Sequence, residues 1–342
     1  MTTVTTDPVS PESSACPVSP GQIAQPRRII LAGGSGFLGT DLARALQARG
    51  DQPIVLSRRP AQDSPWPQVE WDGTALGAWC AQLDGAAALV NLTGRNVNCR
   101  PTRANREEIL RSRVASVRVL GEALRAIAQP PPVWVQASSL AIHGNAQDTL
   151  CDEDSGFSGA WPATVCTAWE STFQEAVLPA QRAVVLRIGF VLAREGGALP
   201  MLERLTRWGL GGSIGSGRQG ISWLHAEDMV RLFLAVIDNP RFTGVLDATA
   251  PGPRSNRDLM RALRRAMGRP WSPPAPVWAV HMGAWMLGSD PHIALTGRYC
   301  RSRRLPELGF DFRFPDLESA LADLYANSPS KPTAALNPTD AS

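Results

Sequence analysis

Short runs of apolar residues alternate along this chain with longer segments in which apolar residues recur every three or four positions. The short runs are typical of strands that are buried on both faces. They lie at residues 29–32, 53–56, 86–92, 133–137 and 183–188. The longer segments predict amphipathic helices over residues 38–46, about 102–128 and about 162–178. Strands that alternate with helices predict an α/β protein with a Rossmann-type, doubly wound parallel sheet.

The amino-acid composition of the sequence changes after Gly189. Residues 195–220 are rich in glycine, and residues 270–280 are rich in proline and tryptophan. Such late segments often cover the substrate in α/β enzymes. We therefore divide the chain into a disordered arm at 1–26, a Rossmann domain at 27–250 with 195–220 contributing to a substrate lobe, a smaller C-terminal α/β lobe at 251–328, and a disordered tail at 329–342.

Composition narrows the functional classes. The 342 residues carry a formal net charge of +3, which is too small and too dispersed to indicate nucleic-acid binding. No apolar run approaches the roughly 18 residues that a membrane span needs. The six cysteines are scattered and form no C-x-x-C pair, so we expect neither a metal site nor a disulfide framework. These features favour a cytoplasmic protein with a small-molecule substrate, and a homodimer is compatible with them.

A glycine-rich segment joins the first predicted strand to the first predicted helix. Residues 33–39, Gly-Gly-Ser-Gly-Phe-Leu-Gly, satisfy both G-x-G-x-x-G and G-x-x-G-x-x-G. Glycines permit a tight turn and bring backbone N–H groups close to a pyrophosphate, and the N-terminus of the helix adds partial positive charge. The segment therefore predicts a dinucleotide site, and a plain tight turn is the alternative. The residues expected to bind the cofactor here are Gly33, Ser35, Gly36, Phe37, Leu38 and Gly39.

The end of the second strand indicates which dinucleotide is bound. An NAD site places an acidic residue there, where it binds the ribose 2′-hydroxyl. This chain instead has Ser57, Arg58 and Arg59. Guanidinium groups bind phosphate through paired hydrogen bonds, so these residues predict NADP(H), with NAD(H) less favoured. The alternative is a solvated pair of arginines.

Several further segments extend this pattern. They are residues 91–94 (NLTG), 108–114 (EILRSRV), 168–170 (AWE), 186–192 (LRIGFVL), 215–219 (GSGRQ), 222–225 (SWLH) and 305–310 (LPELGF). Together they resemble the extended short-chain dehydrogenase/reductase superfamily, and within it the atypical epimerase family branch, which ends in a C-terminal domain of unknown function. The resemblance covers about residues 28–328. It implies further cofactor-binding residues, namely Asn91, Leu92, Thr93, Gly94, Arg111, Ser138 and Arg187. Arg111 and Arg113 lie on one predicted helix near the cofactor site, where one of them could contact a phosphate or an acidic substrate; solvation of both is the alternative.

The pair of residues that transfers the proton in ordinary members of this superfamily is absent. Those members use Tyr-x-x-x-Lys, in which the lysine lowers the pKa of the tyrosine. The only tyrosines here are Tyr299 and Tyr325, and the only lysine is Lys331. By the spacing of the motif, the tyrosine position falls near Pro162 and the lysine position near Cys166. Loss of the pair is a trait of the resembled branch.

Four side chains remain as candidates for catalysis or substrate binding. Ser139 ends the fifth predicted strand and could polarise a carbonyl; a hydroxyl bonded only to the backbone is the alternative. His143 could exchange protons in the following loop, or it could simply pack there. Arg218 lies in a glycine-rich loop and is a candidate for an anion contact. His225 is a substrate candidate for which packing is the favoured interpretation.

Two functions are compatible with these features. The first is an NADP(H)-binding epimerase- or oxidoreductase-like enzyme that acts on a small carbonyl or sugar-nucleotide substrate without Tyr-x-x-x-Lys. The second is a catalytically inactive dinucleotide-binding protein with a regulatory or scaffold role. The cofactor-binding half and the motifs of the lobe persist, which slightly favours the first. The missing pair counts against it, because general acid–base catalysis typically contributes about 10²- to 10⁴-fold in rate.

Overall fold

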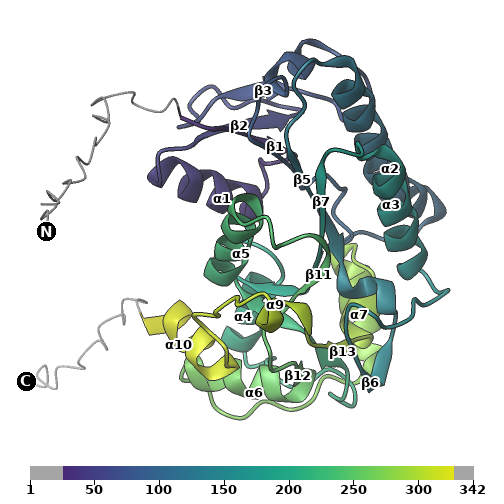
Figure 1. Cartoon of the computed structure of the whole chain (residues 1–342). Coiled ribbons are helices and arrows are strands. Elements are labelled where there is room, and N and C mark those ends of the chain that lie inside the picture. The colour runs from purple at the N-terminus through teal and green to yellow at the C-terminus, as the bar shows by residue number, and fades with distance from the viewer. Residues whose placement is uncertain (1–25, 327–342) are drawn as a thin grey trace, which may run out of the picture.

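Seven parallel strands form the central sheet, in the order β11-β7-β5-β4-β1-β2-β3 (Figure 1). They are β11 (Gly244–Ala248), β7 (Arg182–Ile188), β5 (Val133–Ser139), β4 (Ala88–Asn91), β1 (Arg28–Ala32), β2 (Gln52–Ser57) and β3 (Gln68–Glu70). All five predicted strands are present, and the predicted Rossmann-type α/β fold is confirmed. The computed structural model describes residues 26–326. The tail expected at 329–342 and all but residue 26 of the arm expected at 1–26 therefore lie outside the described residues.

Alternate residues of the central strands enter two different hydrophobic cores. In β1, Ile29 and Leu31 belong to one core, and Ile30 and Ala32 belong to the other. The first core packs under helices α1 (Phe37–Ala48) and α5 (Ala226–Asp238). The second packs under helices α2 (Arg103–Ala126) and α3 (Ala163–Ala176). Because helices cover both faces of the sheet, these strands are apolar at nearly every position.

The remaining α-helices and the two-stranded sheets lie in the lower part of Figure 1. Three small sheets lie here, and each has two strands. They are β6 (Ala146–Cys151) with β13 (Arg298–Cys300), β8 (Phe190–Leu192) with β10 (Trp223–His225), and β9 (Gly220–Ile221) with β12 (Arg254–Ser255). The helices are α4 (Leu199–Arg207), α6 (Asn256–Ala266), α7 (Val277–Leu287), α8 (His292–Leu295), α9 (Arg304–Glu307) and α10 (Leu317–Ala326). Segments from both sides of residue 250 therefore build this region.

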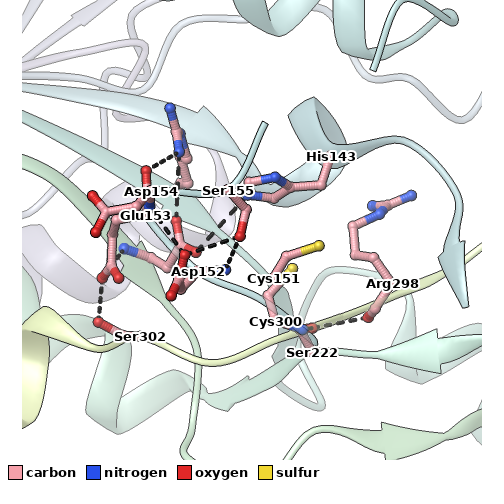
Figure 2. A network of polar contacts seen from close by, with 12 residues as sticks. His143, Cys151, Asp152, Glu153, Asp154, Ser155, Ser222, Arg298, Cys300 and Ser302 are labelled. Atoms are coloured by element: carbon pink, nitrogen blue, oxygen red, sulfur yellow. Dashed lines mark hydrogen bonds and ion pairs between the residues drawn. The ribbon is translucent and has the colours of Figure 1, made fainter. Parts of the chain in front are cut away.

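Strand β13 ties the C-terminal region to the chain that follows β5. It pairs with β6 in parallel, and the hydroxyl of Ser222 connects its two ends (Figure 2). The Ser222 hydroxyl donates to the carbonyl of Arg298 over 3.0 Å and accepts from the N–H of Cys300 over 2.7 Å. This clasp fixes Arg298 near the ends of the central strands.

Helix α7 is almost entirely apolar, yet none of its residues is buried. A bilayer span requires about 20 apolar residues, and α7 has 11. None of the helices within residues 26–326 is long and apolar enough to cross a membrane.

Candidate functional site

A cavity of about 1140 Å³ lies where β1, β2 and β4 end. Its wall combines the glycine-rich segment, the residues that follow β2 and β4, a short segment after β3, and one turn of α2. Among the residues predicted to bind the cofactor, the wall includes Gly33, Ser35, Gly36, Ser57, Arg58, Arg59, Leu92, Thr93, Gly94 and Arg111. In open α/β sheets, ligands bind outside the carboxyl ends of the strands, where this cavity lies.

The glycines of the loop serve two different purposes. Gly33 has a φ of +70°, and a Cβ atom there would lie 2.7 Å from the hydroxyl of Thr93. A Cβ atom on Gly39 would lie 2.4 Å from the Cα of Gly34. At Gly33 and Gly39 the surrounding protein therefore leaves no room for a side chain. A Cβ atom on Gly36, by contrast, would meet nothing within 4 Å, and Gly36 is the N-cap of α1 with no side-chain capping bond. The first turn of α1 therefore presents open backbone to the cavity, as a pyrophosphate requires.

Asn91 lies beneath the loop and does not reach the cavity wall. Its Oδ1 accepts from the N–H of Thr93 over 3.0 Å, and its Nδ2 donates to Oε1 of Gln136 over 3.0 Å. Phe37 and Leu38 pack against the first hydrophobic core, and Phe37 also contacts Gly196. These three residues position the loop and the turn after β4.

Two unpaired arginines line the far end of the cavity. Arg58 and Arg59 are exposed, and no carboxylate among the described residues forms an ion pair with either of them. The backbone N–H of Arg59 donates to the Ser57 hydroxyl over 3.3 Å, which shapes the turn after β2. Arg111 also lines the cavity, but it forms an exposed ion pair with Glu108. The two free guanidinium groups match the requirement of a 2′-phosphate.

One part of this wall was not predicted from the sequence. Residues 71–74, Trp-Asp-Gly-Thr, follow β3 and line the cavity. Asp72 accepts hydrogen bonds from the backbone N–H groups of Thr74 and Ala75, and these bonds lower the pKa of its carboxyl. Strand β3 has three residues and no apolar run, so periodicity gave no signal for it.

A second cavity of about 340 Å³ adjoins the first along α2. Ser112 and Asn96 line the first cavity. Their neighbours in the sequence, Arg113 and Val97, line the second. Ser139, Pro162 and Cys166 all lie in the wall of this smaller cavity. The structure therefore brings together the predicted serine and the two positions where Tyr and Lys would be expected.

The chemistry of this wall differs from that of a tyrosine–lysine site. Burial raises the pKa of the Cys166 thiol to about 11, with the charge of Arg113 opposing the shift. The thiol is therefore protonated at neutral pH and is no substitute for a cationic lysine. The Ser139 hydroxyl accepts from the N–H of Ala141 over 3.2 Å, which leaves its proton free to donate. Tyr299 bonds to the carbonyl of Arg218 and lies in neither wall, and neither wall includes Tyr325.

His143 is buried behind the second cavity, and its side chain is in neither wall. Nδ1 lies 3.2 Å from the carbonyl of Gly156, and Nε2 lies 4.0 Å from Oδ2 of Asp247. Burial is the main cause of the lowered pKa of His143. Burial also raises the pKa of Asp247 to about 8. The structure thus places His143 in a buried polar cluster, away from the positions where a substrate could reach it.

Ser138 and Arg187 also belong to the protein interior. The Ser138 hydroxyl donates to Oε1 of Glu170 over 2.5 Å. Arg187 donates to both carboxylate oxygens of Glu170 at 3.0 Å. Neither residue is in the wall of either cavity. They join β5 and β7 to α3 and so support the wall that Ser139 and Cys166 form.

The two substrate candidates lie outside both cavity walls. Arg218 is exposed, and its Nη2 lies 3.4 Å from Oδ1 of Asp148. His225 is the N-cap of α5, where Nδ1 accepts from the N–H of Glu227 over 3.1 Å. Its ring packs against Phe314 with the centroids 4.0 Å apart. The packing interpretation of His225 agrees with these contacts.

Two charged residues of the second cavity, Arg298 and Asp290, were not among the predicted site residues. The cavity also contains Arg113, for which a contact to a phosphate or an acidic substrate was one of two expectations. Arg113 comes from α2, and Arg298 and Asp290 come from the C-terminal region. Arg113 lies within residues 108–114, one of the segments that resemble the family, but Arg298 and Asp290 have no local sequence signal. Arg298 reaches the cavity because β13 pairs with β6. Figure 2 shows Arg298 next to the clasp that Ser222 forms.

The fold and these cavities define a dinucleotide-binding protein of the short-chain dehydrogenase/reductase class. The sequence profile of the NAD dependent epimerase/dehydratase family matches residues 29–246. The profile of a domain of unknown function, DUF1731, matches residues 275–324. The chain therefore belongs to the NAD dependent epimerase/dehydratase family, and the predicted membership is confirmed.

Relatives match along most of the chain. The epimerase family protein SDR39U1 of Bos taurus is 33% identical over 308 residues, which cover 87% of this chain and 100% of the relative. The human protein SDR39U1 (isoform 2), crystallised with NADPH, superposes with a TM-score of 0.79 at 30% identity, covering 88% of this chain and 100% of that chain. A nucleoside-diphosphate sugar epimerase from Corynebacterium glutamicum superposes with a TM-score of 0.70 at 27% identity, covering 88% of this chain and 59% of that chain.

Proposed function

We propose that this chain binds NADP(H) and uses it in a reductase or epimerase reaction on a small carbonyl or sugar-nucleotide substrate. The observation that carries the proposal is that neighbouring residues of α2, Ser112 and Arg113, line the two cavities. One cavity joins an open helix N-terminus to two unpaired arginines, and the other contains a serine hydroxyl that is free to donate. The NADPH in the human SDR39U1 structure supports the choice of cofactor.

The first cavity would hold the cofactor through contacts along its length. The open backbone around Gly36 would receive the pyrophosphate, and Arg58 and Arg59 would receive the 2′-phosphate. When bound, the nicotinamide of NADP(H) supplies or accepts a hydride.

The second cavity would hold the substrate. Ser139 would donate a hydrogen bond to the substrate oxygen and stabilise the negative charge that develops there. His292 lines the same cavity and is exposed, so its imidazole could exchange a proton with both the substrate and water. These roles replace those of the missing tyrosine and lysine.

Calorimetric titration with NADPH and NADH tests the cofactor half of the proposal. We expect NADPH to bind more tightly than NADH, and Arg58→Ala and Arg59→Ala each to weaken NADPH binding by about tenfold or more, since a charged hydrogen bond contributes about 1.5–3 kcal/mol. Binding of NADH should change little. Arg118→Ala removes an exposed arginine of α2 that lies in neither wall, and it should leave both affinities unchanged. If neither nucleotide binds, the proposal is wrong.

A second candidate function is a protein that binds NADP(H) without turnover. The neutral thiol at the lysine position favours it, because the residue at that position carries no positive charge. Oxidation of NADPH in the presence of small aldehydes, ketones and oxo acids separates the two functions. Turnover that Ser139→Ala abolishes supports the enzyme, and tight NADPH binding without any turnover supports the binding protein.

A further inference from the structure

The second cavity contains two guanidinium groups from distant parts of the chain. Arg113 comes from α2, and Arg298 comes from β13. Both side chains are half-buried, and burial lowers the pKa of each, although an arginine stays charged at neutral pH. Both charges also act on the Cys166 thiol in the wall between them, where they oppose the effect of burial on its pKa. The two cations therefore face a common space.

The protein leaves much of the hydrogen-bonding capacity of both arginines free. Arg113 uses Nη1 for the carbonyls of Arg95 and Ile109, at 3.1 and 3.0 Å. Arg298 uses Nε for the carbonyl of Gly144, at 2.7 Å. Among the described residues, the remaining guanidinium nitrogens have no hydrogen-bond partner, and no ion pair includes either arginine. Arg113 also lies over the ring of Trp169, with its Cζ 5.0 Å from the ring centroid.

The carboxylates near this space do not neutralise it. Asp290 is the one carboxylate in the wall, and it forms no ion pair with either arginine. Its Oδ1 accepts from the N–H of His292 over 2.9 Å. Glu170 lies behind the wall and is paired with Arg187. Two arginines against one aspartate leave a surplus of positive charge, and a partly desolvated cation is stabilised by an anion.

The size of the cavity restricts the ligand. Ligand pockets range from about 300 to 1000 Å³, so 340 Å³ lies at the small end of this range. A small organic acid is better matched to this volume than a sugar nucleotide. Guanidinium groups bind carboxylates through paired N–H donors, and both arginines have terminal nitrogens available for such bonds.

We propose that the substrate of this site is a small organic acid, whose carboxylate binds between Arg113 and Arg298 while its reactive carbonyl or hydroxyl lies beside Ser139. The inference rests on the proposed function and narrows its substrate class. It assigns Arg113 and Arg298 to the substrate and Arg58 and Arg59 to the cofactor. The two pairs therefore have separable effects on binding.

Direct binding measurements on the full chain loaded with NADPH test the inference. The probes are 2-, 3- and 4-oxo acids of three to six carbons, each compared with its uncharged methyl ester by calorimetry. At least one acid should bind the wild-type protein at least tenfold more tightly than its ester. Arg113→Gln and Arg298→Gln should each reduce this preference at least tenfold, and the Lys variants should retain more of it. NADPH affinity should change less than twofold in all four variants.

Exposed arginines near each position provide matched controls. Arg118→Gln on α2 and Arg301→Gln after β13 lie outside both walls and should keep the full preference. The acid-to-ester comparison in the wild-type protein needs no variant, so it remains decisive if a Gln variant fails to fold.

Several outcomes would overturn the inference. The first is a wild-type protein that prefers no acid over its ester, and the second is a preference that survives both Gln substitutions. A loss of NADPH affinity in Arg113→Gln as large as that in Arg58→Ala would make Arg113 a cofactor contact. Tight binding of UDP that depends on both arginines would indicate a nucleotide ligand. Failure of the wild-type protein to bind NADPH contradicts the proposed function alone, because acid binding can also be measured without the cofactor.

Discussion

Arg187 holds the carboxylate of Glu170 at two points, from Nε to Oε1 and from Nη2 to Oε2, each over 3.0 Å. Both side chains are buried between β7 and α3. Ser138 adds a third hydrogen bond to Oε1, so three elements meet at one carboxylate. Since α3 carries Cys166 and β5 ends at Ser139, this pair sets the shape of the second cavity from behind.

Removing the Glu170 carboxylate should therefore destabilise the fold strongly. Glu170→Ala removes the carboxylate that Arg187 contacts at 3.0 Å and leaves Asp247, 4.0 Å away, as its nearest carboxylate. Breaking a buried pair in this way costs about 3–5 kcal/mol. The free energy of unfolding from urea denaturation measures the effect. As a control, Asp154→Ala removes an ion pair between Asp154 and Arg303, whose side chains are 67% and 55% exposed, respectively. The loss of this exposed pair should cost no more than about 1 kcal/mol. Equal losses in the two variants would contradict the structural role of the Glu170 pair.

Asp247 should make the stability of the protein depend on pH. Its buried carboxyl has a pKa of about 8, raised from 3.8 mainly by desolvation and then by Glu153. Between these values the folded state holds a proton that the unfolded state has lost, so stability falls as pH rises through this window. Burial lowers the pKa values of His143 and His225, and these shifts act in the opposite direction, below about pH 6.5. The decline should therefore be clearest between about pH 6.5 and 8, with a slope of up to about 1.4 kcal/mol per pH unit.

Asp247→Asn tests this dependence because it keeps the shape of the side chain without its charge. We expect the free energy of unfolding of the variant to change much less between pH 6.5 and 8 than that of the wild type. Asp148→Asn, at an exposed position, should retain the wild-type slope. A variant with the same slope as the wild type would mean that the Asp247 carboxyl does not titrate in this range.

Two glycines of the loop should separate folding from cofactor binding. Gly33→Ala forces a side chain into a φ of +70° and against the backbone of Thr93 at 2.8 Å, so it should lower stability by about 1–3 kcal/mol. Gly36→Ala meets no protein atom within 4 Å and should leave stability nearly unchanged. Its methyl group instead occupies the space where a pyrophosphate would approach the backbone. Thermal melting and NADPH titration should therefore show a loss of stability in the first variant and a loss of affinity in the second. NADPH binding by Gly36→Ala as tight as that of the wild type would contradict the pyrophosphate position.

Some parts of this molecule are encoded by residues that are close together in the sequence. The five apolar runs became strands because burial on both faces demands apolar residues at every position. Strand β3 (Gln68–Glu70) lacks such a run and lies at the edge of the sheet, so periodicity missed it. The glycine loop and the arginines after β2 were identified because their chemistry depends on neighbours in the sequence.

The substrate end of the site could not be predicted in this way. Arg298 reaches the cavity through the pairing of β13 with β6, which joins residues about 150 positions apart. Ser138 and Ser139 are adjacent in sequence, yet side chains of a strand alternate between faces, and only Ser139 lines the cavity. Arg187 lies within a motif of the family, but the motif does not reveal that its partner is the buried Glu170. Long-range pairing and side-chain direction decided these outcomes.

The two adjacent serines provide the sharpest test of the catalytic proposal. Ser139→Ala removes the donor that faces the second cavity, and loss of one such donor typically lowers kcat by about 10²- to 10³-fold. NADPH affinity should stay the same. Stability should fall by about 1 kcal/mol, since the hydroxyl also caps the short helix η2 (Leu140–His143).

Ser138→Ala removes a bond to Glu170 and should lower stability with little effect on kcat. Measurement of kcat together with urea denaturation for both variants separates the two roles. If both variants lose the same fraction of kcat, Ser139 acts only through the structure of the wall, and the proton and charge of the reaction must be handled elsewhere.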